Sequence, residues 1–456
     1  MAANPDDKIA RGGDLSTTDV SISGTDNPAT EKPGAGLPPV SEAVTEGAAT
    51  PELDDIPNGG LKAWLQVVGA FFIFFNSWGI VNTFGVFQTY YESNLLRTST
   101  PAAISWIGSL QGALLLGGGV LAGPLFDAGY FRALIVTGTA LVSFGFMMTS
   151  LASEYWHVLL GQGFCVGSGA GCIVVPSLAV LPQWFGPSRR ALAVGMCVVG
   201  SSVGGVVYPL LFNGVIGPLG FPWTARLFGF VALATCSVSV AAMRTRVGPR
   251  RVRSLFDPKS FREPPFLFFC AAGFFSNLGF FVPIFYLQTY ALGHGMEHAR
   301  GLALNLIAIL NGASVLGRLA PSLVTPRMGP INTMIAVAAS AGAVACGWIG
   351  VRDVAGNVVF AILYGFFSGG IVSLPPVVLA SITEDLSFLG ARMGTAFLCN
   401  AVGSLCGPPI AGAILRAQGG EYLGLQVFAA VAINGTVLFL LSARVARAGP
   451  RLAVKV

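Results

Sequence analysis

Twelve long apolar stretches follow one another between Leu61 and the C-terminus, and they leave this chain few ways to fold. A helix of about 20 apolar residues crosses the hydrocarbon core of a bilayer, where every backbone polar group must be satisfied within the span. Only 10% of the 456 residues are charged and 53% are hydrophobic, whereas soluble domains carry about a quarter charged residues. We therefore expect an all-α integral membrane protein with twelve transmembrane helices.

The predicted spans divide into two sets of six. They are residues 63–91, 103–122, 132–152, 157–181, 190–213 and 225–243, then 266–292, 302–323, 331–350, 356–380, 392–415 and 423–442. The halves are therefore 61–243 and 266–443, joined by a basic linker at 244–265 and followed by a basic tail at 444–456. Residues 1–60 hold 11 acidic and 3 basic side chains and no apolar run, so we expect a disordered tail without a cleaved signal peptide.

Basic residues gather on one side of the predicted spans. The segments that share a side with both termini hold 17 lysines and arginines after residue 60, against five on the other side. Because cytoplasmic loops carry the excess of Lys and Arg, we expect a multi-pass protein of the cell membrane with both termini in the cytoplasm. Anionic lipid is the expected partner of the basic linker, and nucleic acid is a poor alternative.

The two halves resemble each other at an offset of 200 residues. Gln88-Thr89-Tyr90 recurs as Gln288-Thr289-Tyr290, and LQGALLLG (110–117) recurs as LNGASVLG (310–317). Arg189 and Arg392 each precede a Gly-Ser pair by 11 residues. This pattern resembles that of major facilitator transporters, in which two six-helix repeats enclose a binding site near the bilayer midplane.

One full charge, Arg318, lies deep inside an apolar span, NLIAILNGASVLGRLAPS (305–322). An arginine at bilayer depth costs about 3 kcal/mol or more and cannot lose its proton, so it must face a cavity or bundle interior with a partner. Its counterpart at the repeat offset is Gly118, which we expect to leave room opposite the charge. Arg318 is therefore predicted to bind the anionic group of a substrate. The alternative is a structural arginine satisfied by carbonyls and by amides such as Asn311.

The predicted spans do not contain the residue patterns of a disulfide framework, a metal site or a catalytic site. The eight cysteines lie in or beside apolar stretches without a CxxC pair, which indicates packing rather than disulfides or a metal site. Paired carboxylates, acid-rich metal motifs and Ser/His or Cys/His sets are missing from the predicted spans, so we expect neither an enzyme nor a cofactor. No obligate protein partner is indicated.

Charged residues at the ends of the spans are candidates for a gate. Asp127 and Arg132 lie in the turn GPLFDAGYFR (123–132), and Arg327 takes the place of Asp127 in the second half. Opposite charges at equivalent positions suit pairs that hold the cytoplasmic face closed, although a weak solvated pair is an equal alternative. The full set of gating candidates is Asp127, Arg132, Arg189, Arg190, Arg327 and Arg392.

Three motifs resemble the monocarboxylate porter family of the major facilitator superfamily. NGGLKAW (58–64) resembles the family's Asp-Gly-Gly-x-x-Trp signature, and WFGPSRRALAVG (184–195) resembles its entrance to the fifth helix. The segment 390–413 is similar to the family's eleventh helix. The resemblance covers roughly residues 57–443 and is nearest to the family's fungal branch.

This resemblance carries over only one residue of the substrate site. The family's proton-linked lactate carriers have a lysine in the first helix and an aspartate four residues before the arginine, and these positions hold Asn82 and Ser314 here. Arg318 alone matches. We therefore expect a site made of Arg318, Asn82, Gln111, Asn311 and Ser314, with no Asp, Glu, His or Lys in the interior of the spans to carry a proton.

These features predict a transporter that moves a small organic metabolite, a carboxylate or another organic anion, by alternating access. An exporter of a fungal secondary metabolite with no strict need for a carboxylate is the alternative within the same class. An alternative of another class is a transporter-like sensor that binds ligand without flux, which only the long N-terminal tail favours.

Overall fold

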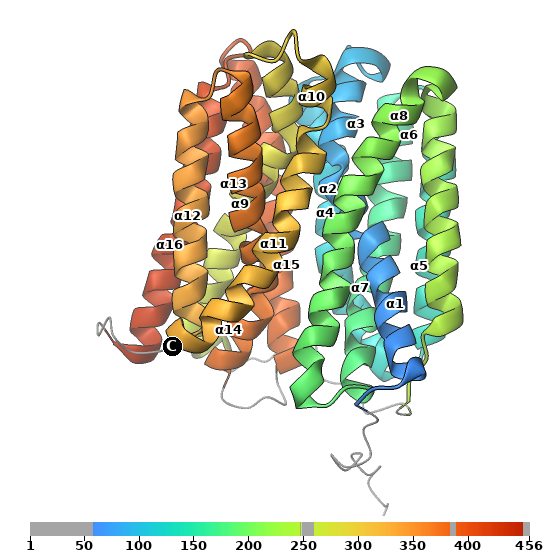
Figure 1. Cartoon of the computed structure of the whole chain (residues 1–456), viewed down its shortest axis with the longest axis vertical. Coiled ribbons are helices and arrows are strands. Elements are labelled where there is room, and N and C mark those ends of the chain that lie inside the picture. The colour runs from blue at the N-terminus through green and yellow to red at the C-terminus, as the bar shows by residue number, and fades with distance from the viewer. Residues whose placement is uncertain (1–57, 247, 249–259, 384–388, 450–456) are drawn as a thin grey trace, which may run out of the picture. The chain divides into compact units, whose positions relative to one another are not determined.

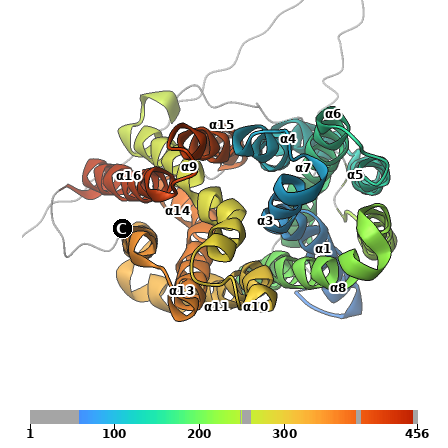
Figure 2. The same ribbon diagram turned by 90° about the horizontal axis from the view of Figure 1, so that it is seen from above.

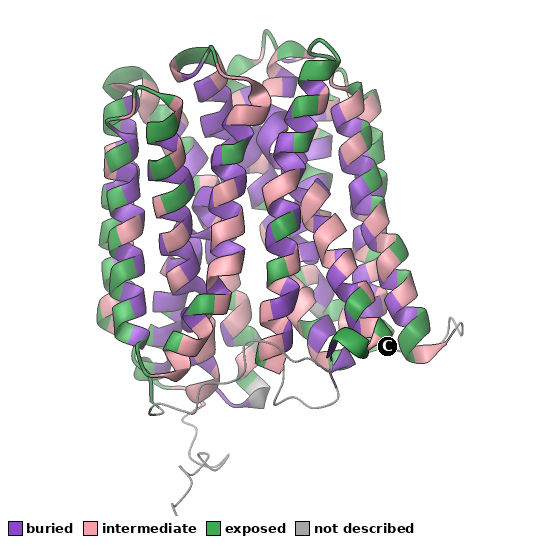
Figure 3. Ribbon diagram, turned by 180° about the vertical axis from the view of Figure 1, so that it is seen from behind, coloured by how far each residue is buried: buried purple, intermediate pink, exposed green. Residues whose placement is uncertain are grey.

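The computed structural model describes residues 58–246, 248, 260–383 and 389–449, and this part of the chain is helical throughout (Figure 1). The predicted disordered tail and most of the basic linker and C-terminal tail lie outside the described residues. Apolar side chains such as Leu61 and Leu323 are exposed on the outer faces of the helices, while buried residues face the interior (Figure 3). This pattern suits a protein surrounded by lipid.

The first half begins with a broken helix of four segments: α1 (Leu61–Asn76), α2 (Trp78–Asn82), α3 (Phe84–Tyr90) and the π-helical η2 (Tyr91–Leu95). It continues with α4 (Pro101–Asp127), α5 (Phe131–Thr149), α6 (Tyr155–Val158), the π-helical η3 (Leu159–Val166), α7 (Gly167–Val180), η4 (Leu181–Gln183) and α8 (Pro187–Ala242). The first span is thus continuous from Leu61 to Leu95 and reaches four residues beyond its predicted end.

The second half follows a short turn, η5 (Ser260–Arg262). Its helices are α9 (Pro264–Gly293), α10 (Arg300–Leu304), α11 (Leu306–Met328), α12 (Pro330–Gly347), η6 (Trp348–Gly350), α13 (Val354–Ser373), α14 (Pro375–Ile382), α15 (Leu389–Ala417) and α16 (Leu423–Ala448). α16 runs beyond residue 443, where the basic tail was predicted to begin.

Eleven of the described helices are long and apolar enough to cross a membrane, and α8 accounts for the twelfth crossing. Its 56 residues would extend over about 84 Å as a straight helix, more than twice the bilayer core. Gly220 breaks it with φ 71° and ψ 171°, a conformation that glycine adopts at little cost. The chain turns back at this point, and the twelve-helix fold is confirmed.

The two halves repeat one packing scheme. In the first half α4 packs on α7 and α5 on both α7 and α8, as α11 packs on α13 and α12 on both α13 and α16 in the second. The halves meet along two seams, where α4 packs against α15 and α8 against α11 (Figure 2), and α3 also packs on its counterpart α9. In the repeat α4 corresponds to α11 and α15 to the first crossing of α8, so each seam is the counterpart of the other. The packing of the helices therefore follows the predicted twofold relation.

The twofold relation is visible in a single hydrogen bond. The hydroxyl oxygens of Thr89 and Thr289 lie 2.9 Å apart, and these residues are separated by the repeat offset of 200. A residue bonds to its own counterpart only where both lie beside the pseudo-twofold axis. The bond joins α3 to α9 at the end of the bundle opposite the chain termini.

Candidate functional site

A cavity of about 760 Å³ lies between the two halves and holds Arg318 in its wall. Its remaining wall is mainly apolar and includes the aromatic rings of Phe74, Trp78, Phe269, Phe280 and Phe397. Arg190 is the second charged residue among the described residues that line it, and none of these is a carboxylate. Cavities of roughly 300–1,000 Å³ with few polar groups are typical of small-molecule sites.

The cavity reaches the end of the bundle at which both termini lie, which we call the termini side. Arg190 in the first turn of α8, Pro326 near the end of α11 and Pro375 at the start of α14 belong to its lining. At the opposite side the α4–α15 seam is tight, because a Cβ on Gly412 would lie 2.7 Å from the Ala102 nitrogen. Near the termini side, a Cβ on Gly394 would lie 3.9 Å from the Val120 side chain.

The α8–α11 seam is likewise tight at the opposite side and looser towards the termini side. At the opposite side Nδ2 of Asn213 donates to the Leu304 carbonyl at 2.7 Å. Towards the termini side the hydrogen bonds across the seam are longer, 3.4 Å between the Ser202 and Ser314 hydroxyls and 3.3 Å from Nη1 of Arg318 to the Val198 carbonyl. Gly195 then has no atom within 4 Å of the place of a Cβ and lines the cavity. The halves are therefore closed on one side and parted on the termini side.

Arg318 is buried, with a relative exposure of 7%, yet it contacts the cavity. Its Nε donates to the Ser314 hydroxyl and its Nη1 to the Val198 carbonyl on α8, both at 3.3 Å. In the described part of the chain no carboxylate pairs with it. Two of the five guanidinium N–H groups are used in these bonds, so three remain for a ligand.

The predicted amides lie away from the cavity lining. Asn82 and Gln111 are buried in the first half, and the Asn82 side-chain oxygen and both Gln111 amide atoms have no described partner. Asn311 donates to the Ile307 carbonyl at 2.9 Å and packs against α8 at Gly205. Ser314 positions Arg318 through their hydrogen bond. Of the five predicted binding residues, only Arg318 lines the cavity.

The space beside Gly118 is filled, against expectation. A Cβ on Gly118 would lie 2.8 Å from the Gly171 Cα on α7, so this glycine allows α4 and α7 to approach closely within the first half. Small residues serve this purpose in membrane helices. The open space beside Arg318 is the cavity between the two halves.

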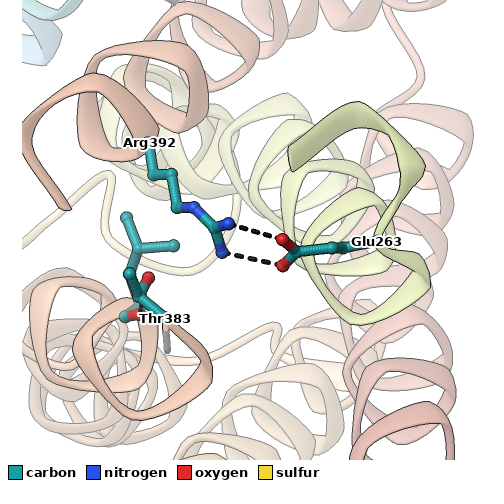
Figure 4. A network of polar contacts seen from close by, with 4 residues as sticks. Glu263, Thr383 and Arg392 are labelled. Atoms are coloured by element: carbon teal, nitrogen blue, oxygen red, sulfur yellow. Dashed lines mark hydrogen bonds and ion pairs between the residues drawn. The ribbon is translucent and has the colours of Figure 1, made fainter. Parts of the chain in front are cut away.

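Arg189 and Arg392 occupy equivalent positions on the termini side. Nη1 of Arg189 donates to the Asn58 carbonyl at 3.2 Å, just before the first helix of its half. Arg392 makes two bonds of 2.8 and 2.5 Å to the Glu263 carboxylate, just before the first helix of the second half (Figure 4). The ring of Phe266 lies 5.6 Å from the Arg392 guanidinium. Each of these bonds lies within one half, so a gating role for either arginine remains a prediction.

The other gating candidates form no described ion pair with one another. Asp127 is the last residue of α4 and is half-buried, while Arg132 and Arg327 are exposed. Arg190 donates to the Phe185 carbonyl at 3.4 Å and lines the cavity. Asp127 lies at the end of α4, which packs mainly on α15 and α7, and Arg327 lies near the end of α11, which packs mainly on α13 and α8. Pairing between them stays a prediction for the state closed on the termini side.

Two asparagines in the cavity wall were missed, Asn277 on α9 and Asn400 on α15. Both are polar residues in the middle of apolar spans, which is the signal that selected Asn82 and Asn311. The apolar pattern around them is too uniform to indicate which helix face meets the cavity. The rotation of each helix about its own axis determines which asparagines line the cavity, and the sequence alone did not indicate that rotation.

The prediction of spans without a carboxylate was also wrong. Because the first helix continues through η2, Glu92 lies inside the span Leu61–Leu95. Its carboxylate accepts a hydrogen bond of 2.7 Å from Nε2 of Gln88 and contacts Thr289 of the second half. Glu92 therefore lies at the closed seam, away from Arg318 and outside the cavity lining.

Two six-helix repeats around a central cavity that opens at one side define an alternating-access membrane transporter. The family model described as the Major Facilitator Superfamily matches residues 67–360. The chain belongs to this superfamily, and it is a multi-pass membrane protein. The superfamily is one of transporters rather than enzymes.

Several curated relatives are fungal transporters. The chain is 44% identical to the MFS-type transporter dbaD of Emericella nidulans, over 82% of this chain and 84% of that protein. It is 38% identical to the aspyridones efflux protein apdF of the same organism, over 87% and 81% of the two chains. It is also 38% identical to the MFS transporter asaE of Aspergillus flavus, over 88% and 91%.

Solved transporter structures share the fold. A POT family transporter in complex with 5-aminolevulinic acid superimposes with a TM-score of 0.70 at 13% identity, over 86% of this chain and 99% of that one. The nucleoside transporter NupG gives a TM-score of 0.64 at 12% identity, over 84% and 99%. At these identities the likeness concerns the fold alone.

Proposed function

We propose that this protein exports a small, partly apolar organic anion by alternating access, with Arg318 as the anion-binding residue. The observation that carries the proposal is a buried arginine with three unused N–H groups in the wall of an apolar cavity, where none of the described lining residues is a carboxylate. A buried cation without a counter-ion is costly, and a bound anion would remove that cost.

Export is the proposed direction because a relative with 38% identity is named as an efflux protein for aspyridones. The volume of about 760 Å³ and the aromatic lining suit an apolar metabolite body as large as a drug molecule. A secondary metabolite with an anionic group fits both observations. The monocarboxylate porter branch remains a proposal that rests on the motifs at 58–64, 184–195 and 390–413.

Flux in proteoliposomes tests this proposal. We expect purified protein to release a fluorescent naphthalenesulfonate from vesicles faster than protein-free vesicles do, because a fixed negative charge and an apolar body match the cavity. Excess 2-naphthoate should compete with this flux, and its methyl ester should compete at least about tenfold more weakly, since the ester lacks the charge that Arg318 binds. Equal competition by the ester would refute the anion site. Binding of these anions without flux would instead favour a membrane sensor.

We propose that both termini and the 244–265 linker are cytoplasmic in the cell membrane. Among the described residues, Lys62, Arg132, Arg189, Arg327 and Arg447 lie on the termini side, while the opposite side holds Arg97, Arg226, Arg300, Arg352 and Arg416. With the linker and C-terminal tail included, the sequence totals of 17 and five favour a cytoplasmic termini side.

Epitope tags at residues 30, 250 and 450 test this orientation. We expect all three to be accessible to antibody only after the cells are permeabilised. A tag in the 294–299 turn serves as the positive control, because it is expected to be labelled in intact cells. Labelling of any of the three tags in intact cells would overturn the proposed orientation.

A further inference from the structure

Two asparagines in the cavity wall share one anchoring point. Nδ2 of Asn277 on α9 donates to the Gly273 carbonyl oxygen at 3.0 Å. One amide atom of Asn400 on α15 lies 3.2 Å from both the Gly273 and the Ala396 carbonyl oxygens, so it is the nitrogen and donates to both. Both side chains line the cavity. The Gly273 carbonyl oxygen thus accepts hydrogen bonds from two side-chain amides, one on α9 and one on α15.

This anchoring determines which polar atoms the wall presents. An amide whose nitrogen is tied to backbone carbonyls has its side-chain oxygen left to accept a hydrogen bond. None of the described hydrogen bonds is made to Oδ1 of Asn277 or Asn400. Gly273 is part of the arrangement, because a Cβ there would collide with the Asn400 amide. The wall formed by α9 and α15 therefore offers acceptors, while Arg318 on α11 offers only donors.

We infer that Asn277 and Asn400 select substrates that carry a hydrogen-bond donor, an O–H or N–H group, apart from the anion that Arg318 binds. The substrate class is then an apolar organic acid that bears a hydroxyl or N–H group on its body. This inference rests on the proposed function, since it takes Arg318 as the residue that fixes the anionic end.

Alternating access makes these two oxygens selective. While the cavity is open to the termini side, water can satisfy both carbonyl oxygens. When the halves close around a substrate, water is excluded and each unpaired oxygen costs about 1–3 kcal/mol. A substrate that donates to them avoids this cost, whereas an isostere without the donor does not. Sites built to bond a substrate hydroxyl reject the analogue that lacks it far better than apolar pockets distinguish a methylene.

A purely structural role is the alternative. Asn76, Asn311 and Asn434 also donate to the carbonyl four residues earlier, and none of the three lines the cavity. Such bonds satisfy a lone amide in an apolar helix without any ligand. Asn434 is therefore a matched control, because it makes the same local bond on α16 outside the cavity.

Matched probe pairs test the inference on the purified full-length protein. The probes are 6-hydroxy-2-naphthoate and 4′-hydroxybiphenyl-4-carboxylate, each compared with its methoxy analogue, which keeps the oxygen and loses the donor. Binding is followed by tryptophan quenching, since Trp78 lines the cavity. In at least one pair we expect the hydroxyl probe to bind about tenfold more tightly than its methoxy analogue. Asn277→Leu and Asn400→Leu should each reduce that ratio towards one, while affinity for the methoxy probe changes little.

The controls separate the two levels of the proposal. Asn434→Leu should leave the hydroxyl-to-methoxy ratio at its parental value. Arg318→Met should weaken both probes of a pair alike and keep the ratio, so unchanged affinity in this variant defeats the proposed function alone. The inference itself fails if no hydroxyl probe is preferred by the parental protein, or if the ratio survives both asparagine replacements. Retained binding of the methoxy probe shows that each variant is folded.

Discussion

Replacing Arg318 with methionine is expected to weaken binding of an anionic substrate at least about tenfold and to abolish most of its transport. Removing one partner of a secluded arginine–anion pair costs about 2–5 kcal/mol, and 1.4 kcal/mol corresponds to a factor of ten. Methionine keeps much of the side-chain length and leaves the apolar wall intact. Equilibrium binding in detergent and initial flux in proteoliposomes measure the two effects.

Stability should respond in the opposite way to binding. Arg318 has no described counter-ion and bonds only Ser314 and the Val198 carbonyl, so Arg318→Met removes a costly buried charge and should leave the thermal midpoint unchanged or raised. Arg318→Lys should restore binding only in part, because an ammonium replaces a two-pronged donor. Arg416→Met is the control, since Arg416 is exposed at the end of α15, lies outside the cavity lining and is not a gating candidate. If a well-expressed Arg318→Met protein transported substrate at the parental rate, the proposal that Arg318 binds the anion would be refuted.

Joining positions 89 and 289 covalently is expected to stop transport almost completely. The Thr89 and Thr289 hydroxyl oxygens are 2.9 Å apart, so the pair Thr89→Cys and Thr289→Cys places two thiols within reach of a disulfide or a short bifunctional reagent. The link holds the opposite side closed, whereas alternating access requires this seam to part. Flux should fall after oxidation and recover after reduction.

The single variants provide the control for this experiment, because the chain also carries eight native cysteines. Thr89→Cys alone and Thr289→Cys alone should transport at the same rate before and after oxidation. Cleavage at a protease site inserted in the 244–265 linker would report the link, since only linked halves stay together under denaturing conditions. A protein that is fully linked and still transports would show that this seam does not open.

The fold was predictable because each signal for it is local or periodic. Apolar length fixes a membrane crossing, and the 200-residue offset fixes which segments correspond. The two crossings of α8 were correctly predicted as separate spans, 190–213 and 225–243, on either side of the break at Gly220. The end of the first span was less predictable, because the π-helical turn η2 extends the helix through the polar segment Tyr91–Leu95.

The site was predictable only where a residue is costly by itself. Arg318 stands out in any environment, since its charge is expensive throughout the bilayer core. A buried asparagine is less costly, because its side-chain amide can donate a hydrogen bond to the carbonyl four residues earlier on any face of a helix. Asn82 and Asn311 therefore looked equivalent to Asn277 and Asn400 in sequence, and only the rotation of each helix distinguishes them.

Glu92 changes the expectation about protons. The sequence predicted no Asp, Glu, His or Lys in the interior of the spans to carry a proton, and among the described residues none of these lines the cavity. That prediction does not hold for the closed seam, where Glu92 contacts Gln88 and Thr289.

The hydrogen bond between Thr89 and Thr289 also limits which side chains the axis can hold. A group that meets its own copy must both donate and accept, as a hydroxyl does and a carboxylate or an ammonium does not. One turn further along the helix, Glu92 is consistent with this rule, because its counterpart in the second half is not an acid but Leu292. In an assembly of two identical halves, the carboxylate would appear twice beside the axis and repel itself. Fusion of the halves into one chain is what permits a single acid at the seam.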